Sequence, residues 1–316
     1  MKTLVFLEHH DGELQAGSLG VLAKAGRLGG EVAGVVLGKG ARAAAAQAGG
    51  TVYVSEAPEL EAPLPQPRVD ALAQLVREQG FDTLLFAASV LSADVAAGLA
   101  ARLDAGLNWD LVDLVEQDGQ LVGKRPALQD SVYVDVGWTS EPRLALIRSG
   151  TFDAEEAAGE AQVEELDVSF EDFSTRARML EQAHEESSGP SIEDAEVIVA
   201  GGRGLGAPDK FTLVEELAKA LGGAVGATRA VVDAGWYPYQ HQIGQTGKTV
   251  SPKLYVACGI SGAIQHKVGM QSAGTIVAIN KDANAPIFEF ADLGVVGDLH
   301  AIVPKLTELV RERRGS

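Results

Sequence analysis

The sequence predicts an α/β protein with two Rossmann-like domains, and three observations support that fold class. Short apolar runs rich in β-branched residues alternate with stretches of helical periodicity, which is the pattern of a parallel sheet covered on both faces. A polar segment interrupts this alternation, which then starts again. The length of 316 residues fits about two domains of ordinary size.

The first half contains the elements of a parallel sheet followed by a run of further strands. Strands are predicted at 3–7, 32–37, 51–54 and 83–87, and helices at 17–27, 68–79 and 92–103. From residue 108 turn residues separate apolar runs at 108–116, 131–137 and 143–148, with no helix between them. We expect these later strands to form an antiparallel extension of the same sheet.

The second half is predicted to form a doubly wound sheet. Strands are expected at 196–200, 254–258, 275–279 and 287–290, and helices at 209–221, 264–269 and 299–313. The segment before it is polar, has Gly-Pro at its centre and shows no apolar period. We therefore predict domains at 1–185 and 195–316, joined by a linker at 186–194.

The composition indicates an ordinary globular protein. Apolar residues make up 46% of the chain and charged residues 22%. No apolar run approaches the roughly 20 residues that a membrane-spanning helix needs, and the N-terminus lacks the features of a signal or transit peptide. We therefore expect a cytoplasmic protein that is not itself a membrane protein. Since Cys258 is the only cysteine, an intrachain disulfide and a cysteine-rich metal site are excluded.

The net charge of −18 is distributed very unevenly. Residues 1–190 contain 31 acidic and 14 basic residues, whereas residues 191–316 contain 13 and 12. A strongly acidic first half disfavours binding to nucleic acid and to anionic membrane surfaces. The nearly neutral second half is the better host for an anionic cofactor.

Two sequence patterns suggest chemistry that their details do not support. His9, His10 and Asp11 suggest a metal site, but adjacent residues of a strand point to opposite faces, so no metal is expected. Residues 244–249 resemble a phosphate-binding Walker A loop, but Gln242 stands where the first glycine of that motif belongs. We expect there a turn with a functional Thr246 hydroxyl rather than a nucleotide-hydrolysing site.

Three further features of the second half leave two interpretations open. The glycine-rich turn at 201–206 contains Arg203 and is either a phosphate-binding turn or an ordinary connection, since its spacing does not match the dinucleotide fingerprint. Arg229 is either an ion-pair partner or a ligand contact. His266, which follows a glycine-rich strand end, is either a satisfied side chain or a ligand contact.

The second half resembles the C-terminal domain of the α subunit of electron transfer flavoprotein, from about residue 197 to residue 307. The most specific phrase is Gly-Ile-Ser-Gly-Ala-Ile-Gln-His at 259–266. Gly-Arg-Gly at 202–204, Ala-Thr-Arg at 227–229, Gly-Gln-Thr-Gly-Lys at 244–248 and Ala-Ile-Asn-Lys-Asp at 278–282 occur in the order that the family has. The first half agrees with the family in architecture only.

The resemblance implies that FAD binds in the C-terminal domain, in a cleft that faces a β subunit, while the N-terminal domain holds no cofactor and contacts that subunit. Arg203 and Thr228 are expected at the pyrophosphate, Arg229 against the isoalloxazine ring, Thr246 near flavin N5 with Gln245 beside it, and His266 near the C2 carbonyl. Ser261 is expected at the pyrophosphate or ribityl chain, and Asn280, Asp298 and Leu299 around the adenosine. The complete set of expected FAD-binding residues is Arg203, Thr228, Arg229, Gln245, Thr246, Gly259, Ser261, Gly262, Gln265, His266, Asn280, Asp298 and Leu299.

The implied function is that of the FAD-carrying subunit of a heterodimeric soluble electron carrier. It takes electrons from acyl-CoA dehydrogenases, as in fatty acid β-oxidation, and passes them to a membrane quinone oxidoreductase, without substrate turnover of its own. Two alternatives remain: a subunit of an electron-bifurcating complex that oxidises NADH, and a non-redox nucleotide-binding module. The resemblance is imperfect at residues 236–241, which are more aromatic than usual and either pack on the β subunit or shield the flavin.

Overall fold

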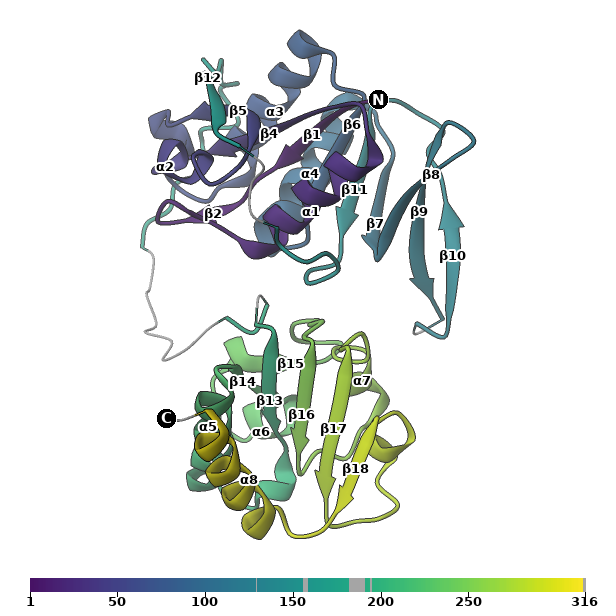
Figure 1. Ribbon diagram of the computed structural model, residues 1–316. Coiled ribbons are helices and arrows are strands. Elements are labelled where there is room, and N and C mark those ends of the chain that lie inside the picture. The colour runs from purple at the N-terminus through teal and green to yellow at the C-terminus, as the bar shows by residue number, and fades with distance from the viewer. Residues whose placement is uncertain (129, 156–158, 182–190, 194, 315–316) are drawn as a thin grey trace. The chain divides into compact units, whose positions relative to one another are not determined.

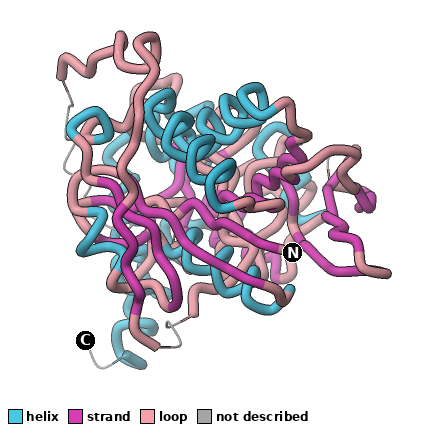
Figure 2. The backbone as a smooth tube through the Cα atoms, turned by 90° about the horizontal axis from the view of Figure 1, so that it is seen from above, coloured by secondary structure: helices cyan, strands magenta, loops and turns pink. Residues whose placement is uncertain are grey.

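The computed structural model describes residues 1–128, 130–155, 159–181, 191–193 and 195–314 (Figure 1). The chain divides into two compact units, Met1–His184 and Glu185–Ser316, which we call the N-terminal unit and the C-terminal unit. In each unit, helices alternate with the strands of a parallel sheet (Figure 1). Figure 2 shows the helices and strands of the chain from a second direction. Most of the linker predicted at 186–194 lies outside the described residues. No helix in the described part of the chain is long and apolar enough to cross a membrane.

A seven-stranded parallel sheet forms the centre of the N-terminal unit, with the order β12-β5-β4-β1-β6-β11-β7. Its strands are β1 (Lys2–Phe6), β4 (Glu31–Leu37), β5 (Gly50–Ser55), β6 (Thr83–Ala87), β7 (Leu107–Leu111), β11 (Arg143–Ile147) and β12 (Ala161–Glu165). A short hairpin, β2 (His9–His10) and β3 (Glu13–Leu14), follows β1. Within the described residues, no group of three or more metal-binding side chains forms there or elsewhere.

The expected antiparallel extension of this sheet is wrong in its arrangement. The antiparallel strands β8 (Asp113–Gln117), β9 (Gln120–Ala127) and β10 (Val132–Val136) form a separate three-stranded sheet. β7 and β11 instead join the main sheet in the parallel direction. The reason is burial: four of the five residues of β11 are buried, as in a strand covered on both faces, whereas β10 is largely exposed.

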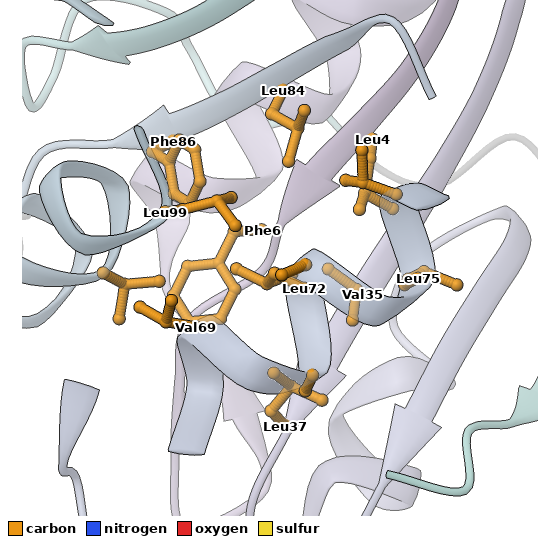
Figure 3. Close-up of a cluster of buried hydrophobic side chains, with 14 of the residues drawn as sticks. Leu4, Phe6, Val35, Leu37, Val69, Leu72, Leu75, Leu84, Phe86 and Leu99 are labelled. Atoms are coloured by element: carbon orange, nitrogen blue, oxygen red, sulfur yellow. The ribbon is translucent and has the colours of Figure 1, made fainter. Parts of the chain in front are cut away.

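Two hydrophobic layers enclose the main sheet of the N-terminal unit. The helices α3 (Pro65–Gln79) and α4 (Val90–Leu103) pack on one face. Figure 3 shows Val69, Leu72 and Leu75 of α3 beside Phe6 and Val35 of the strands. The other face is covered by α1 (Ala16–Leu28), α2 (Ala41–Ala45) and the antiparallel sheet. Each fully buried leucine or valine contributes about 1.5–3 kcal/mol, so these layers hold the strand ends in fixed positions.

The C-terminal unit has a six-stranded parallel sheet with the order β15-β14-β13-β16-β17-β18. Its strands are β13 (Val197–Gly201), β14 (Ala224–Thr228), β15 (Gln242–Ile243), β16 (Leu254–Cys258), β17 (Thr275–Asn280) and β18 (Leu293–Val296). Numbered along this unit, the strands lie in the order 3-2-1-4-5-6, which is that of a dinucleotide-binding sheet. The predicted fold class, α/β with two Rossmann-like domains, is confirmed.

The helices of the C-terminal unit cover mainly one face of its sheet. α5 (Phe211–Leu221) and α8 (Leu299–Arg314) form a buried cluster with this face, together with α6 (Arg229–Val232). The opposite face is covered by loops and short helical turns, among them α7 (Ile264–Lys267) and η5 (Pro286–Glu289). The other 3-10 turns in the described part of the chain are η1 (Pro58–Leu60), η2 (Arg203–Leu205), η3 (Pro208–Lys210) and η4 (Tyr239–His241).

Two predicted elements of this unit are wrong in type or length. Residues 287–290, predicted as a strand, lie largely in the 3-10 turn η5, where Pro286 at the first position favours a helical start. The outermost strand is β18, whose residues are mostly exposed, so it lacks the apolar signal on which the prediction depended. The helix predicted at 264–269 is only a single turn, α7.

Candidate functional site

The candidate site lies at the carboxyl edge of the C-terminal sheet, because every residue of the predicted set ends a strand or follows one. Arg203 follows β13, Thr228 ends β14, and Asn280 ends β17. The other predicted residues follow β14 (Arg229), β15 (Gln245, Thr246), β16 (Gly259, Ser261, Gly262, Gln265, His266) and β18 (Asp298, Leu299). In a parallel sheet these ends share one edge, and ligands of open α/β sheets bind there, at the point where the strand order reverses.

Two glycine turns meet at this reversal point, which lies between β13 and β16. The amide of Gly202 donates to the Cys258 carbonyl at 3.0 Å, and the amide of Gly204 donates to the Gly259 carbonyl at 2.9 Å. A Cβ atom on Gly204 would lie only 2.6 Å from the Gly259 Cα, and Gly259 has a φ of 65°. Only glycine permits this approach. The main chains of the two turns are therefore in contact at the position where a pyrophosphate binds in such folds.

Thr228, at the end of the neighbouring strand, has a buried hydroxyl that needs a partner. Its Oγ1 atom is buried and makes no hydrogen bond within the described residues. A buried polar group without a partner costs about 1–3 kcal/mol, so such atoms are few in native proteins. The orphaned hydroxyl therefore fits a ligand acceptor beside the two glycine turns.

The two arginines of the edge are available to a ligand. Arg203 is exposed, and its side chain makes no hydrogen bond or ion pair in the described part of the chain. Arg229 forms an ion pair with Asp233 one turn along α6, at 3.1 Å, and both side chains are more than 60% exposed. Such a pair contributes about 0.5 kcal/mol or less, so Arg229 leaves it at little cost if a ligand offers more. Arg229 is thus an ion-pair partner in this structure and is still free to become a ligand contact, so neither interpretation made from the sequence excludes the other.

The loop after β15 is held by bonds to its main chain. Gln245 donates its amide to the Gln265 carbonyl at 2.7 Å. Gln242 donates from Nε2 to the carbonyl and the hydroxyl of Thr246, at 2.9 and 3.2 Å, and the Tyr239 hydroxyl donates to the same carbonyl at 3.0 Å. Neither Gln242 nor Tyr239 belongs to the set of residues predicted from the sequence. The local sequence, which is polar on both sides of the two-residue strand β15, carried no signal for Gln242, since its burial is evident only in the structure.

His266 is a buried side chain with both ring nitrogens bonded inside the C-terminal unit. Nδ1 lies 3.0 Å from the Ile243 carbonyl oxygen, and Nε2 lies 2.9 Å from the Tyr255 hydroxyl. A carbonyl only accepts, so the ring proton is on Nδ1 and Nε2 accepts from Tyr255. Burial lowers the pKa of His266 to about 4, so the imidazole is neutral at physiological pH. A ring-nitrogen contact with a flavin carbonyl would therefore require exchange of one of these bonds.

The remaining predicted residues surround the glycine turns. Asn280 donates to the Ile260 carbonyl at 2.9 Å, and Asp298 caps α8 by accepting from the His300 amide at 2.9 Å. Leu299 is buried, and its side chain would be 2.8 Å from a Cβ atom on Gly259.

The loop that follows the strand β16 is fixed by another close approach. Gly262 has a φ of 84°, and a Cβ atom there would be 2.3 Å from the Ile287 nitrogen. The side chains of Ser261 and Gln265 are exposed and make no hydrogen bond in the part of the chain that the structure describes. Main-chain bonds and glycine contacts thus fix this loop, while two polar side chains remain available to a ligand.

The aromatic segment at 236–241 packs partly on its own unit. The Tyr237 ring stacks on Phe211 with centroids 4.5 Å apart, and its hydroxyl donates to Glu215 at 3.2 Å. Burial raises the pKa of Tyr237, which stays neutral. Tyr239 remains exposed. Neither interpretation made from the sequence anticipated that Tyr237 would pack on α5.

Comparison with known proteins gives a consistent family. The family model described as the electron transfer flavoprotein FAD-binding domain matches residues 191–271, and that of the electron transfer flavoprotein domain matches residues 3–171. The chain is 42% identical to the electron transfer flavoprotein subunit alpha of Mycobacterium tuberculosis, covering 99% of both chains. It is 38% identical to the protein of that name from Thermoanaerobacterium thermosaccharolyticum, covering 98% of this chain and 97% of the relative. The Bacillus subtilis protein is 38% identical, with 97% and 96% covered.

Proposed function

The chain belongs to the family of electron transfer flavoprotein alpha subunits, its cofactor is FAD, and from this premise we propose that it is the FAD-carrying subunit of a heterodimeric electron carrier. In this proposal it takes electrons from acyl-CoA dehydrogenases and related flavoenzymes, delivers them to a membrane quinone oxidoreductase, and turns over no substrate of its own.

One observation supports the proposal above the others. At the strand-order reversal of the C-terminal sheet, the glycine turns after β13 and β16 are in contact, and the Thr228 hydroxyl beside them is buried with no hydrogen-bond partner among the described residues. Such an edge is suited to the pyrophosphate of a dinucleotide. We assign this position to the pyrophosphate of FAD, with Arg203 and Thr228 as its side-chain partners and Gly259, Ser261, Gly262 and Gln265 around it.

The flavin end of the cofactor is assigned to the loops after β14 and β15. Arg229 would lie against the ring, and Gln245 and Thr246 would face the N5 side. Asn280, Asp298 and Leu299 would surround the adenosine. Bound FAD supplies the redox chemistry by accepting and donating electrons, whereas the protein supplies position and electrostatic stabilisation.

The side chains around the flavin then set how easily it takes an electron. A cation that can leave its exposed ion pair, as Arg229 can, favours negative charge on the ring. His266 is neutral and internally bonded, so it would act near the ring as a dipole rather than as a charge.

The proposed partners follow from the family. Each relative named above is called a subunit alpha, which supports a β subunit as the second half of the dimer. In this proposal the N-terminal unit contacts the β subunit and holds no cofactor.

The test is a visible absorption spectrum of the chain co-purified with its β subunit, followed through stepwise reduction. The proposal predicts one FAD per dimer that acyl-CoA dehydrogenase reduces when its substrate is present and that NADH does not. Arg229→Ala should lower the reduction potential of the flavin, and Arg229→Lys should restore most of it. Two flavins with bleaching by NADH would instead indicate the bifurcating alternative, and a colourless complex that cannot be loaded with FAD would contradict the proposal.

A further inference from the structure

The N-terminal unit has its own strand-order reversal, and a carboxylate fills it. β4 and β5 lie on one side of β1, and β6 lies on the other, so the order reverses between β1 and β6. Glu8 follows the end of β1, and Ser89 follows the end of β6. The edge between them corresponds in topology to the one that carries the glycine turns in the C-terminal unit.

The Glu8 carboxylate is surrounded by hydrogen-bond donors. The hydroxyls of Ser89 and Ser92 both donate to its Oε2 atom, at 2.5 and 2.9 Å, and Gln15 donates from Nε2 to its Oε1 atom at 3.4 Å. The side chain of Glu8 belongs to the buried set, with the residue 9% exposed. Two short bonds from hydroxyls to one buried oxygen are the surroundings that a bound anion receives.

Two helices begin at this carboxylate. Gln15 precedes the first turn of α1, which has 13 residues, and Ser89 is the N-cap of α4, which has 14. Ser89 accepts the Ser92 amide at 2.9 Å while donating its own proton to Glu8, so it links the carboxylate to the amides of α4. The positive ends of helix dipoles bind phosphate and carboxylate groups. Glu8 therefore occupies a position made for an anion.

A buried cation lies nearby without a carboxylate of its own. Arg68 of α3 is 5% exposed, donates only to the carbonyls of Leu60, Ala62 and Leu64, and forms no ion pair within the described residues. Burial lowers the pKa of Arg68 to about 10, and the negative charge of Glu8 opposes this shift. The cation thus lies within electrostatic range of the same carboxylate.

His9 of β2 brings a further unsatisfied donor or acceptor close to the loop after β4. A Cβ atom on Gly38 would be 3.1 Å from Arg68 Nη2 and 3.9 Å from His9 Nε2, so these side chains meet at that glycine. The Nδ1 atom of His9 is buried without a hydrogen-bond partner in the described part of the chain. This orphaned atom and the unpaired Arg68 are features of a ligand site that the single Glu8 carboxylate fills only in part.

We propose that Glu8 is a built-in anion that occupies the phosphate position of a dormant site for a phosphorylated ligand at the carboxyl edge of the N-terminal unit. The carboxylate satisfies the hydroxyls and the helix ends that would otherwise bind a phosphate group, and it repels an incoming one. The N-terminal unit therefore keeps the scaffold of a nucleotide-binding domain but excludes the ligand. Removing this side chain opens the site to a phosphate monoester.

The experiment compares phosphate binding by three forms of the full-length chain co-purified with its partner. Inorganic phosphate and then AMP are titrated by calorimetry into the wild type, Glu8→Ala and Glu13→Ala, in a buffer without other oxyanions. Glu13 is an exposed acid on β3, so its loss changes the net charge equally without opening the site. Glu8→Ala should bind phosphate at least tenfold more tightly than either other form. Equal binding by all three forms would overturn the proposal.

A second substitution tests the position of the new site. In the Glu8→Ala background, Ser92→Ala removes one of the two hydroxyls, so it should take away most of the gain in phosphate affinity. A gain that survives unchanged would place the phosphate elsewhere and would overturn the proposal.

Should Glu8→Ala fail to fold, phosphate itself serves as the probe. A ligand that binds only the native state shifts folding toward that state. Phosphate at tens of millimolar should then restore the native circular dichroism spectrum of Glu8→Ala, and should do so less for Leu99→Ala, a core variant of α4 that reports general salt stabilisation. Equal rescue, or none, would contradict the proposal.

Discussion

The two units reverse their strand order in the same way but differ in what fills the edge at that point. In the C-terminal unit the main chains of Gly204 and Gly259 touch at this edge, between the ends of β13 and β16, and neither residue carries a polar side chain. In the N-terminal unit the corresponding edge between β1 and β6 holds the carboxylate of Glu8, bonded to Ser89 and Ser92. One edge is open to an anionic cofactor and the other already contains an anion.

This difference shows that a shared scaffold does not decide which domain binds a cofactor. Both sheets are parallel and both are covered by helices whose N-termini lie at the carboxyl edge. The choice depends on a few residues directly after two strands: glycines, which permit close approach, or a glutamate, which satisfies the available donors internally. Substitutions at those positions are therefore the way to test the comparison.

The largest effect is expected from removing the carboxylate of the N-terminal unit. Glu8→Ala removes two hydroxyl-to-carboxylate bonds and leaves their donors facing each other, so the free energy of unfolding of this unit should fall by about 2–4 kcal/mol. Urea denaturation in a buffer without phosphate measures it. Glu13→Ala, on the exposed face of the hairpin, should stay within about 0.5 kcal/mol of the wild type. An equally small effect of both variants would show that the Glu8 carboxylate does not stabilise this edge more than an exposed acid does.

Disrupting the contact between the two glycine turns of the C-terminal unit should have nearly as large an effect, in this case on the affinity for FAD. The Cβ atom of Gly204→Ala would lie 2.6 Å from the Gly259 Cα, so the two turns must separate. We expect FAD affinity to fall about 100-fold, which corresponds to about 2.7 kcal/mol. Quenching of flavin fluorescence on titration into the FAD-free protein gives the affinity. Gly137→Ala, where a Cβ atom meets no other atom within 4 Å, serves as the control and should bind FAD normally.

Lowering the pH should reduce the free energy of unfolding of the C-terminal unit, because His266 is buried as a neutral side chain. Its pKa is lowered from 6.5 to about 4 in the folded protein, so below pH 6.5 the unfolded chain takes up a proton that the folded one refuses. The free energy of unfolding is therefore highest at pH values above 6.5, and it falls progressively as the pH falls toward 4. Between pH 6.5 and pH 5 the loss should be about 1.6 kcal/mol.

The matching measurement is urea denaturation of the FAD-free chain at these two pH values. His266→Gln should flatten the pH dependence, whereas His300→Gln, at an exposed position on α8, should leave it as in the wild type. An unchanged slope in His266→Gln would show that His266 takes up its proton at the same pH in the folded and the unfolded chain, contrary to its bonding pattern.

The smallest expected effect has opposite signs with and without cofactor. Thr228→Val replaces a buried hydroxyl that has no partner in the described chain, so the FAD-free protein should be as stable as the wild type or more so. The same variant should bind FAD about tenfold more weakly, or about 1.4 kcal/mol, because the ligand loses its donor. Thr228→Ser keeps the hydroxyl and should retain the affinity. Thermal melts and FAD titrations of both variants decide this, and equal FAD affinity in all three forms would exclude Thr228 from the site.

The sequence supports prediction of the fold class and of most buried strands, because a run such as 254–258 is apolar along its whole length and is buried in the structure. It does not support prediction of β14, where Gly226 interrupts the apolar run to make room for Ile243, or of β18, whose residues face solvent at the edge. The direction of β11 also depends on which strand lies beside it, and local patterns carry no information on that.

The predicted site residues were placed along one edge, but their individual bonding could not be derived from the sequence. That His266 is paired twice depends on Tyr255 and Ile243, which lie 11 and 23 positions away in the chain and enter no motif. That the Thr228 hydroxyl is buried without a partner among the described residues is likewise a property of the folded unit. Glu8 was passed over for a similar reason. An acid after an apolar strand looks like the beginning of a loop until Ser89 and Ser92, some 80 positions later, are seen beside it.

A crystal structure of the FAD-loaded chain with its β subunit tests the central claim most directly. We expect the pyrophosphate to lie at the contact of Gly204 and Gly259, with the Thr228 hydroxyl within hydrogen-bonding distance. We also expect Glu8 to remain bonded to Ser89 and Ser92, with no nucleotide at that edge. A pyrophosphate located away from the glycine turns, or a nucleotide that displaces Glu8 in the wild-type chain, would contradict that claim.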